Sequence, residues 1–270
     1  MDYFEGKVAL ITGASRGVGL ATARELVRRG ARVVITARGA ERLESSRSQL
    51  ARMGGEVIAV PGDVGTWEDS HAMAAAAVSG FGRLDILVNN AGVSMRGDLA
   101  ELAPEVISRV LATNLAGAMY VTRAALPSLV ASRGHVVFIS SIAGLFGLPG
   151  ASAYCASKGG LTGLCESLRL ELEPSGVHAG IVYLGFTEHD PEKRILACDG
   201  SLVPPDRPAH HPQSLAAESI LAMIEKRRRR LVMTPVGKLG MVAYRVSPGL
   251  VERAILFARS SRLGIYERFS

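Results

Sequence analysis

The sequence predicts an α/β fold, a doubly wound parallel sheet of about seven strands with helices on both faces. Two observations lead to this prediction: short apolar runs alternate with helical patterns, and glycine or polar residues follow several of the apolar runs. In such sheets ligands bind at the carboxyl ends of the strands. We expect one domain over residues 1–236 and a basic, partly apolar helical extension over residues 237–270.

The predicted strands are short apolar segments, and most are flanked by turn residues. They cover residues 7–12, 32–37, 56–60, 84–88, 135–139, 177–183 and 231–233. Helical patterns lie between them, because apolar residues recur three or four positions apart and so share one helix face. Examples are Val18–Thr22–Leu26, Val106–Val110–Asn114, Leu161–Leu164–Leu168 and residues 214–227. The stretch 185–213 is rich in proline and charge, and we expect it to form a lid over a substrate.

A glycine-rich turn joins the first strand to the first helix. Glycine lets the backbone approach a pyrophosphate closely, and the helix N-terminus offers free N–H groups and a partial positive charge. A tight structural turn is the alternative interpretation, but the position between a strand and a helix favours a dinucleotide site. The candidate cofactor residues of the turn are Gly13, Ser15, Arg16, Gly17, Val18 and Gly19.

The second strand ends without an acidic residue. Dinucleotide sites for NAD usually place Asp or Glu at this point to bind the ribose 2′-hydroxyl. Here the strand ends Thr36-Ala37-Arg38, and Arg16 is expected on the same side of the fold. Either arginine alone is equally well explained as a solvated surface charge. Together they suit a 2′-phosphate, which arginine binds in a bidentate manner, so we expect NADP(H) rather than NAD(H).

Tyr154 and Lys158 are the candidate acid–base pair. They lie four residues apart in a helical pattern, so both side chains can point into one space. A tyrosine normally keeps its proton up to a pH of about 10, and a nearby ammonium lowers that value. Proton transfer near neutral pH then becomes feasible. A surface tyrosine beside a solvated lysine is the alternative interpretation of these two residues taken alone.

Taken in order, the motifs resemble the short-chain dehydrogenases/reductases, a family with a Rossmann-like fold. The resemblance covers about residues 7–190, and it rests on Thr12-Gly13-x3-Gly17-x-Gly19, Asp63, Asn89-Asn90-Ala91-Gly92, Asn114, Ser141 and Tyr154-x3-Lys158. It implies hydride transfer between NADP(H) and a carbonyl or secondary alcohol, with Tyr154 as the general acid–base group. Lys158 would assist Tyr154 and bind the nicotinamide ribose. Ser141 would orient the substrate oxygen, and Asn114 would hold a water that relays protons to Lys158.

The resemblance also implies cofactor contacts at other strand ends. Asp63 and Val64 would meet the adenine, and Asn90, Ala91 and Gly92 would line the adenosine ribose. Gly185 and Thr187 would contact the cofactor after the sixth strand. The sequence departs from the family there, because Leu184 replaces the usual proline and His189 stands where a threonine is usual. His189 is either a substitute donor or a solvent-facing loop histidine.

The expected substrate is a small apolar ketone, aldehyde or secondary alcohol. The side chains expected to face it are nearly all apolar: Val93, Met95, Leu145, Phe146, Leu148, Leu184 and Phe186. Other interpretations are a dinucleotide-binding scaffold without turnover and a peripheral membrane interaction protein. Epimerases and dehydratases also use a Tyr/Lys pair, but they usually carry a sugar-nucleotide domain, for which this chain has no segment.

Charge and cysteine content limit the partners, metals and cellular compartment that we expect for this protein. The net charge of +6 arises from residues 226–270, which contain 11 Lys/Arg and 2 Asp/Glu, whereas residues 1–225 carry −3. The run at 226–230 is explained by a helix C-terminus, where cations are favoured. The segments beyond it, at 241–246 and 250–259, mix apolar residues with arginines, and they are explained equally by an anionic membrane surface or by packing over the pocket or a second subunit. No nucleic-acid motif accompanies the basic charge. The three cysteines lack paired or metal-type spacing, so we expect no metal and a reduced, cytoplasmic setting. We expect no signal peptide and no membrane span, because residues 1–5 are acidic and no apolar run reaches about 20 residues. The expected assembly is a homodimer or homotetramer.

Overall fold

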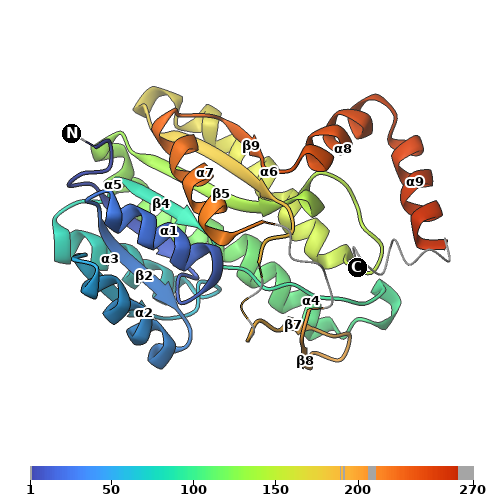
Figure 1. The fold of residues 1–270 in the computed structure, drawn as a ribbon, viewed down its shortest axis with the longest axis horizontal. Helices are drawn as coiled ribbons and strands as arrows, with labels where there is room; N and C mark the ends of the chain where they lie inside the picture. Colours follow the sequence, from blue (N-terminus) through green and yellow to red (C-terminus); the bar gives the residue numbers. More distant parts are fainter. Residues whose placement is uncertain (1, 189, 191, 206–210, 261–270) are drawn as a thin grey trace.

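Seven parallel strands form the central sheet of the chain, in the order β3-β2-β1-β4-β5-β6-β9 (Figure 1). The computed structural model describes residues 2–188, 190, 192–205 and 211–260. The predicted parallel α/β fold is confirmed. The strands are β1 Val8–Thr12, β2 Arg32–Ala37, β3 Val57–Pro61, β4 Ile86–Asn89, β5 His135–Ser141, β6 His178–Leu184 and β9 Arg230–Val232.

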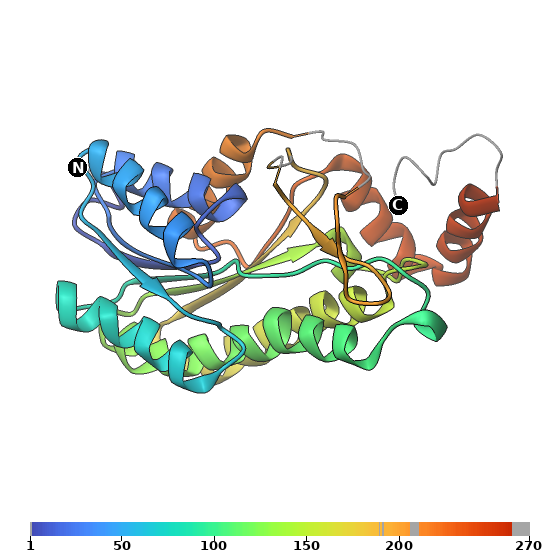
Figure 2. The same cartoon turned by 90° about the horizontal axis from the view of Figure 1, so that it is seen from below.

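Helices cover both faces of this sheet (Figure 2). One face packs against α1 Gly17–Arg28, α2 Ala40–Arg52 and α7 Gln213–Glu225. The other face packs mainly against α3 Trp67–Phe81, α5 Gly117–Ser132 and α6 Ser152–Glu171, with α4 Pro104–Leu111 beside α6. Every residue of β1 is buried, as expected for a strand covered on both sides.

Strand ends differ from the predicted ones by one or two residues, because backbone pairing rather than apolar character sets them. β5 and β6 both run past their apolar segments, and their last residues, Ser141 and Leu184, pair with each other. β4 begins at Ile86 rather than Leu84, and the carboxylate of the preceding Asp85 accepts the N–H of Val8 at 2.9 Å.

The predicted helix through Val106, Val110 and Asn114 is interrupted. It ends at Leu111, and one π-helical turn, Ala112–Ala116, joins α4 to α5. Such turns insert an extra residue into an α-helix and occur frequently at functional sites. The turn holds Asn114 inside the molecule, where only 1% of its surface is exposed.

The lid and the C-terminal extension leave the sheet at its carboxyl edge. In the lid, a short antiparallel pair forms from β7 Ile195–Leu196 and β8 Leu202–Val203, and Leu196 also pairs with the backbone of Ser94 and Arg96. The extension consists of α8 Pro235–Val246 and α9 Pro248–Ser260, which we call the arm. The predicted boundary at 236 falls inside α8. Residues 206–210 of the lid and 261–270 of the extension lie outside the described residues.

None of the helices in the described ranges is both long and apolar enough to cross a bilayer.

Two buried histidines lie at the amino ends of β5 and β6, on the edge of the sheet opposite the strand ends that bind ligands. The Nδ1 atoms of His135 and His178 are 3.2 Å apart. His178 Nε2 lies 3.1 Å from the carbonyl oxygen of Arg228, and Tyr3 Oη lies 2.7 Å from His135 Nε2. Because a carbonyl only accepts, His178 donates to Arg228; with both rings neutral, His178 then accepts from His135, which in turn accepts from Tyr3. In this arrangement every ring nitrogen is paired.

Burial lowers the pKa of both histidines. Burial, helped by repulsion from His178, lowers the pKa of His135 from 6.5 to about 3, and burial lowers that of His178 to about 4. Between those values and about pH 6.5, the unfolded chain binds protons at these rings that the folded chain does not. Folding stability must therefore fall as the pH decreases through this interval, by up to about 1.4 kcal/mol per pH unit for each histidine.

We predict that His178→Gln makes the free energy of unfolding less dependent on pH between about pH 4 and 6.5. Urea unfolding over a pH series measures the slope. The matched control is His71→Gln, because His71 is exposed on α3 and its replacement should leave the slope unchanged. Parallel slopes for the wild type and His178→Gln would show that the histidine pair does not govern acid stability.

Candidate active site

The glycine turn after β1 is packed against the end of β4. A β-carbon on Gly13 would lie 2.8 Å from the Cα of Ala91, and one on Gly19 would collide with Asn90 Nδ2 and lie 2.6 Å from the carbonyl oxygen of Gly13. Gly13 and Gly17 both have φ in the left-handed region, at 64° and 61°. Only glycine satisfies these requirements without strain. Close packing of the tight turn therefore requires glycine at positions 13 and 19.

Polar side chains lock this turn to the neighbouring strand. Asn90 Nδ2 donates to the carbonyl oxygens of Thr12 and Gly13 at 2.9 and 3.1 Å. Thr12 Oγ1 accepts the backbone N–H groups of Asn90 and Ala91, both at 3.0 Å. The amide of Asn90, predicted to line a ribose, thus holds the turn in place. Thr12 belongs to the glycine motif, but its role in joining β1 to β4 was not predicted.

The turn can accept a pyrophosphate, because it is open to solvent beside Gly17 and at the N-terminus of α1. A β-carbon built on Gly17 has no atom within 4 Å. No side chain caps the N-terminus of α1, and no acidic residue lies in its first turn. The free N–H groups of the helix therefore face open space with nothing to repel an anion. Ser15 uses its carbonyl oxygen to accept from Ser46 at 3.0 Å, and Val18 packs on the core.

Arginines gather at the end of β2, and the lid contacts them. Arg16 Nη1 donates to the carbonyl oxygen of Glu192 at 3.0 Å. Arg42, which was not predicted as a site residue, forms ion pairs with Glu192 and with Asp190, the latter at 3.8 Å. Burial lowers the pKa of the Arg16 guanidinium, attraction by Asp190 opposes this, and Arg42, Arg194 and Arg38 add to the lowering by repulsion. Arg16 therefore lies within a group of four arginines bordered by lid carboxylates.

Arg38 is half-exposed and lies nearest to an acid of the next strand end. Its Nη1 is 3.7 Å from the Oδ2 of Asp63. Asp63 Oδ1 also accepts the N–H of Gly65 at 2.8 Å. Asp63, predicted to meet the adenine, thus lies beside the predicted 2′-phosphate residue. The Val64 side chain is buried, and its carbonyl oxygen accepts from Ser70 at 3.0 Å.

Lys158 is a buried cation at the carboxyl end of β5. Only 5% of the residue is exposed, and its Nζ donates to the carbonyl oxygen of Ile139 at 2.8 Å. Burial, followed by repulsion from Lys193, lowers the pKa of Lys158 to about 8. The Nζ lies 5.9 Å from the centre of the Tyr154 ring. The helix α6 therefore brings the phenol and the ammonium together, as the four-residue spacing predicts.

Asn114 lies near Lys158, on the other side of Gly92. Its Oδ1 accepts the N–H of Val93 at 2.8 Å, and its Nδ2 donates to the carbonyl oxygen of Val93 at 2.9 Å and to Ser157 Oγ at 3.0 Å. Ser157 Oγ donates in turn to the carbonyl oxygen of Tyr154 at 2.7 Å. A β-carbon on Gly92 would lie 3.2 Å from Asn114 Oδ1 and 3.4 Å from Lys158 Nζ. Asn114, Gly92 and Lys158 therefore face one another. Ser157, between Tyr154 and Lys158 in sequence, was not identified.

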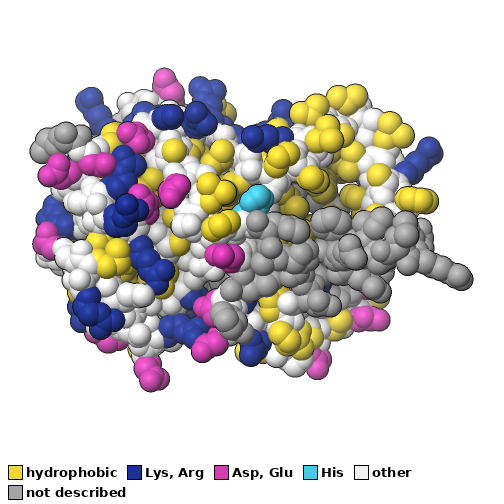
Figure 3. All heavy atoms as spheres, viewed as in Figure 1, with side chains coloured by type: hydrophobic (Ala, Val, Ile, Leu, Met, Phe, Trp, Pro, Cys, Tyr) yellow, Lys and Arg dark blue, Asp and Glu magenta, His cyan; other side chains and the backbone are white. Residues whose placement is uncertain are grey.

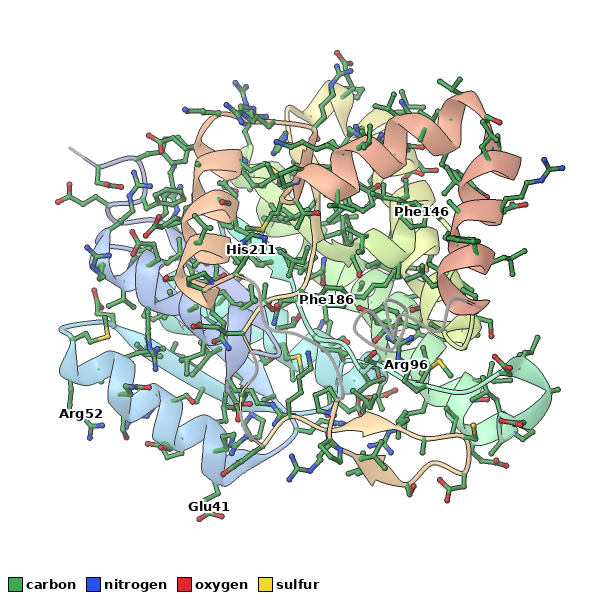
Figure 4. All side chains as sticks on the ribbon, turned by 45° about the vertical axis from the view of Figure 1, so that its right-hand side comes forward. Glu41, Arg52, Arg96, Phe146, Phe186 and His211 are labelled. Carbon is green, nitrogen blue, oxygen red and sulfur yellow. The ribbon has the colours of Figure 1, made fainter. Side chains whose placement is uncertain are left out.

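A cavity opens beside Tyr154 and Ser141. Ser141 ends β5, and its Oγ accepts the N–H of Ala143 at 3.2 Å. The lid closes one side of the cavity, and Figure 4 shows Phe186 and Arg96 near it. The lining residues are Ser94, Met95, Arg96, Ser141, Ile142, Ala143, Leu148, Ala151, Tyr154, Phe186, Lys193, Ile195 and Pro205. The cavity thus has an apolar wall, two cations, and both hydroxyl groups of the predicted reaction.

The comparisons with known proteins agree with this geometry. The family model described as short chain dehydrogenase matches residues 7–197. The chain belongs to the short-chain dehydrogenase/reductase family. It is an oxidoreductase of that family, whose members use a nicotinamide dinucleotide.

Relatives and solved structures of this family cover most of the chain. "Dehydrogenase/reductase SDR family member 7B" of Bos taurus is 35% identical over 93% of this chain and 81% of its own length. The granaticin polyketide synthase "putative ketoacyl reductase 1" of Streptomyces violaceoruber is 40% identical over 70% of each chain. A short chain dehydrogenase/reductase from Burkholderia phymatum in complex with NAD superposes with a TM-score of 0.82, at 25% identity, over 93% of this chain and 96% of its own.

A second solved structure contains the phosphorylated cofactor type. It is an alcohol dehydrogenase from Thermococcus sibiricus complexed with 5-hydroxy-NADP, with a TM-score of 0.74 and 26% identity. The match covers 84% of this chain and 95% of that one. Structures similar to this short-chain dehydrogenase/reductase therefore bind either cofactor.

Of the seven side chains predicted to face a substrate, Met95, Leu148 and Phe186 line the cavity, and four pack elsewhere. Val93 packs with the cluster around α4, Leu145 on the core beneath α6, and Leu184 on the core beside α1 and α7. Phe146 packs on Tyr244 of α8, with ring centres 6.0 Å apart, and Figure 4 shows it beside the arm. These four side chains contact hydrophobic residues of other helices and strands, and the spatial positions of those elements could not be predicted from the sequence.

The two predicted cofactor residues after β6 have contacts within the chain. Gly185 lies against Thr234, which caps α8, and Thr187 is buried and bridges to His211. His189 lies outside the described residues. Among the described residues, no group of three or more His, Cys, Asp or Glu side chains could hold a metal ion.

We predict that Gly19→Ala weakens binding of the dinucleotide by about tenfold or more, because the new methyl group forces the Asn90 amide and the Gly13 carbonyl apart. Titration of nucleotide fluorescence measures the affinity. Gly163→Ala is the matched control, since it also lies in a helix and a β-carbon there meets nothing within 4 Å. An affinity equal to that of the wild type would mean that the packed turn does not position the cofactor.

Proposed function

We propose that this protein transfers a hydride between NADP(H) and the carbonyl or secondary alcohol of an apolar small molecule, with Tyr154 as the general acid–base group. One observation supports the proposal above all. The buried ammonium of Lys158 is held at 5.9 Å from the Tyr154 ring, and Tyr154 and Ser141 line one cavity. A phenol, a cation and a hydroxyl group at one opening are what carbonyl reduction requires from the protein.

The residues have separate tasks in this proposal. The bound nicotinamide supplies or accepts the hydride. Tyr154 gives a proton to the carbonyl oxygen during reduction and takes it back during oxidation. Lys158 stabilises the phenolate that remains, because an opposite charge nearby favours the ionised form. Ser141 donates to the substrate oxygen and stabilises the charge that develops on it.

Asn114 positions the reacting groups in this scheme. Its amide connects the Val93 backbone to Ser157, which binds the carbonyl oxygen of Tyr154. The first turn of α6 is therefore tied to the segment after β4. Such support keeps catalytic groups within the small tolerance that proton transfer demands.

The arginines at the end of β2 support NADP(H) over NAD(H). In this fold the ribose 2′-position of a bound dinucleotide lies at the end of β2. Three arginines lie around that position, Arg16, Arg38 and Arg42, and the tip of β2 carries no acid that would repel a 2′-phosphate. Arginine forks bind phosphate oxygens in pairs. The cofactor that fits this charge pattern is the phosphorylated one.

The cavity supports a substrate with an apolar body and a polar or anionic end. Met95, Leu148, Phe186 and Ile195 supply apolar walls, whereas Arg96 and Lys193 bring positive charge to the same cavity. From the sequence, only the apolar part of this cavity is predicted. A panel that pairs neutral ketones with keto acids and keto esters of equal carbon number, followed by NADPH absorbance, tests this class.

We predict that Tyr154→Phe lowers kcat by about a hundredfold or more while NADPH still binds, because the variant lacks only the hydroxyl group that exchanges the proton. Steady-state turnover and NADPH fluorescence report the two quantities separately. Tyr120→Phe removes a hydroxyl group from the surface of α5 and should leave turnover unchanged. Turnover by Tyr154→Phe close to the wild-type value would remove this residue from the reaction.

We predict that Arg38→Ala lowers the affinity for NADPH by about 10- to 100-fold and changes that for NADH little, because only the 2′-phosphate forms charge-assisted hydrogen bonds there. Calorimetric titration of both nucleotides gives the ratio. Arg52→Ala, at the far end of α2, is the control. Equal losses for the two nucleotides would contradict the assignment of NADP(H).

A further inference from the structure

The arm exposes more large apolar side chains than any other part of the described chain. Sixteen large hydrophobic residues are exposed among the described residues, and seven of them lie on the arm. Figures 1 and 2 place α9 at the far end of the molecule, away from the sheet, and Figure 3 shows apolar side chains gathered over this region. The seven are Val236, Leu239, Val242, Val246, Leu250, Leu256 and Phe257, exposed by 55 to 81%. Apolar surface gathered in this way marks an interaction site.

Helix α8 has two distinct faces. Leu239, Val242 and Val246 are spaced three and four residues apart, so they form one stripe, and all are exposed. The opposite face holds the helix on the domain: Met241 packs on the core, and Tyr244 packs on Phe146. The outward stripe is therefore not a disordered end but the free side of a docked helix.

Helix α9 repeats the arrangement. Leu250 and Phe257 are seven residues apart and exposed by 66 and 72%, which places them on one face. Arg253 lies three residues after Leu250 and four before Phe257, so it shares that face. Glu252, the only acid of the arm between residues 235 and 260, lies nearly opposite Leu250 on the helix.

The charges on the arm border its apolar stripes. Lys238 and Arg245 are exposed and lie four residues before and three after Val242. They are separate from the basic run at 226–230, part of which binds the domain itself: Arg227 donates to the carbonyl oxygen of Gly176 at 2.7 Å, and Arg230 pairs with Glu166 at 2.8 Å. An apolar stripe with cations along its border is typical of helices that lie in the surface of an anionic membrane.

We propose that the arm binds the surface of an anionic membrane, with the stripe Leu239–Val242–Val246 and the face of Leu250 and Phe257 among the acyl chains. Lys238, Arg245 and Arg253 then reach the lipid phosphates, as long basic side chains do at an interface. The charge favours a membrane over a second copy of the arm, because two arms would bring these cations together. This inference does not depend on the cofactor or the substrate.

Sedimentation of the full chain with vesicles tests the proposal. We expect the wild type to sediment with phosphatidylcholine vesicles that contain about 30 mol% phosphatidylserine, to bind pure phosphatidylcholine far less, and to dissociate at high salt. Leu239→Ser/Val246→Ser should lower the partition coefficient about tenfold or more. Leu99→Ser/Leu170→Ser removes two similarly exposed leucines outside the arm and should leave the partition coefficient unchanged.

Charge variants and fold controls complete the test. Lys238→Gln/Arg245→Gln should weaken binding by roughly fivefold per removed charge, whereas Arg52→Gln/Arg109→Gln, exposed at other sites, should have a much smaller effect. All variants should keep the wild-type melting temperature. Three results would overturn the proposal: no sedimentation of the wild type with anionic vesicles, equal binding by Leu239→Ser/Val246→Ser, or loss of a dimer in light scattering by that variant without loss of vesicle binding.

Discussion

The active site depends on one buried charge, the ammonium of Lys158. A cation that is only 5% exposed is stable only when its N–H groups find hydrogen-bond acceptors. The Nζ of Lys158 donates to the carbonyl oxygen of Ile139 at 2.8 Å. Three parts of the chain must be in place for this: β5, which supplies Ile139, the second turn of α6, which carries Lys158, and the segment around Gly92 that Asn114 holds. Burial also keeps the pKa of Lys158 near 8, so the ammonium forms a strong field beside Tyr154 while remaining largely protonated at neutral pH.

The cofactor turn obeys a different constraint, which is close packing. Gly13 and Gly19 leave no room for a methyl group, and the spare donors of Asn90 and the hydroxyl of Thr12 tie β1 to β4. These two strands are the pair at which the order of the sheet reverses, so the turn lies at the crevice where ligands bind in such folds. The lid reaches the same crevice from the other side, since Glu192 contacts both Arg16 and Arg42. The arginines available for a 2′-phosphate are thus also contacts of the lid.

Local patterns in the sequence were enough for the sheet, the glycine turn and the Tyr154–Lys158 pair, because each depends on residues within one or two elements. The failures are long-range. Phe146 was expected in the cavity, but it packs on Tyr244, almost 100 residues away in the chain. The pairing of Arg42 with the lid spans about 150 residues. The π-helical turn at Asn114 has no signature in apolar periodicity, since its extra residue is stabilised by contacts to Val93 and Ser157. The assignment of the domain boundary, the substrate pocket as a whole and the partners stays a prediction.

The basic C-terminal segment shows how structure separates charges that the sequence groups together. Arg227 and Arg230 are bound to the domain through Gly176 and Glu166, so the run at 226–230 serves the edge of the sheet. The cations of the arm have another setting, because Lys238, Arg245 and Arg253 border apolar stripes that the domain leaves exposed. Helix α8 touches Phe146, in the loop that also supplies Ile142 and Leu148 to the cavity wall. An arm bound to a membrane would therefore hold that wall of the cavity close to the lipid surface, where apolar carbonyl compounds are most concentrated.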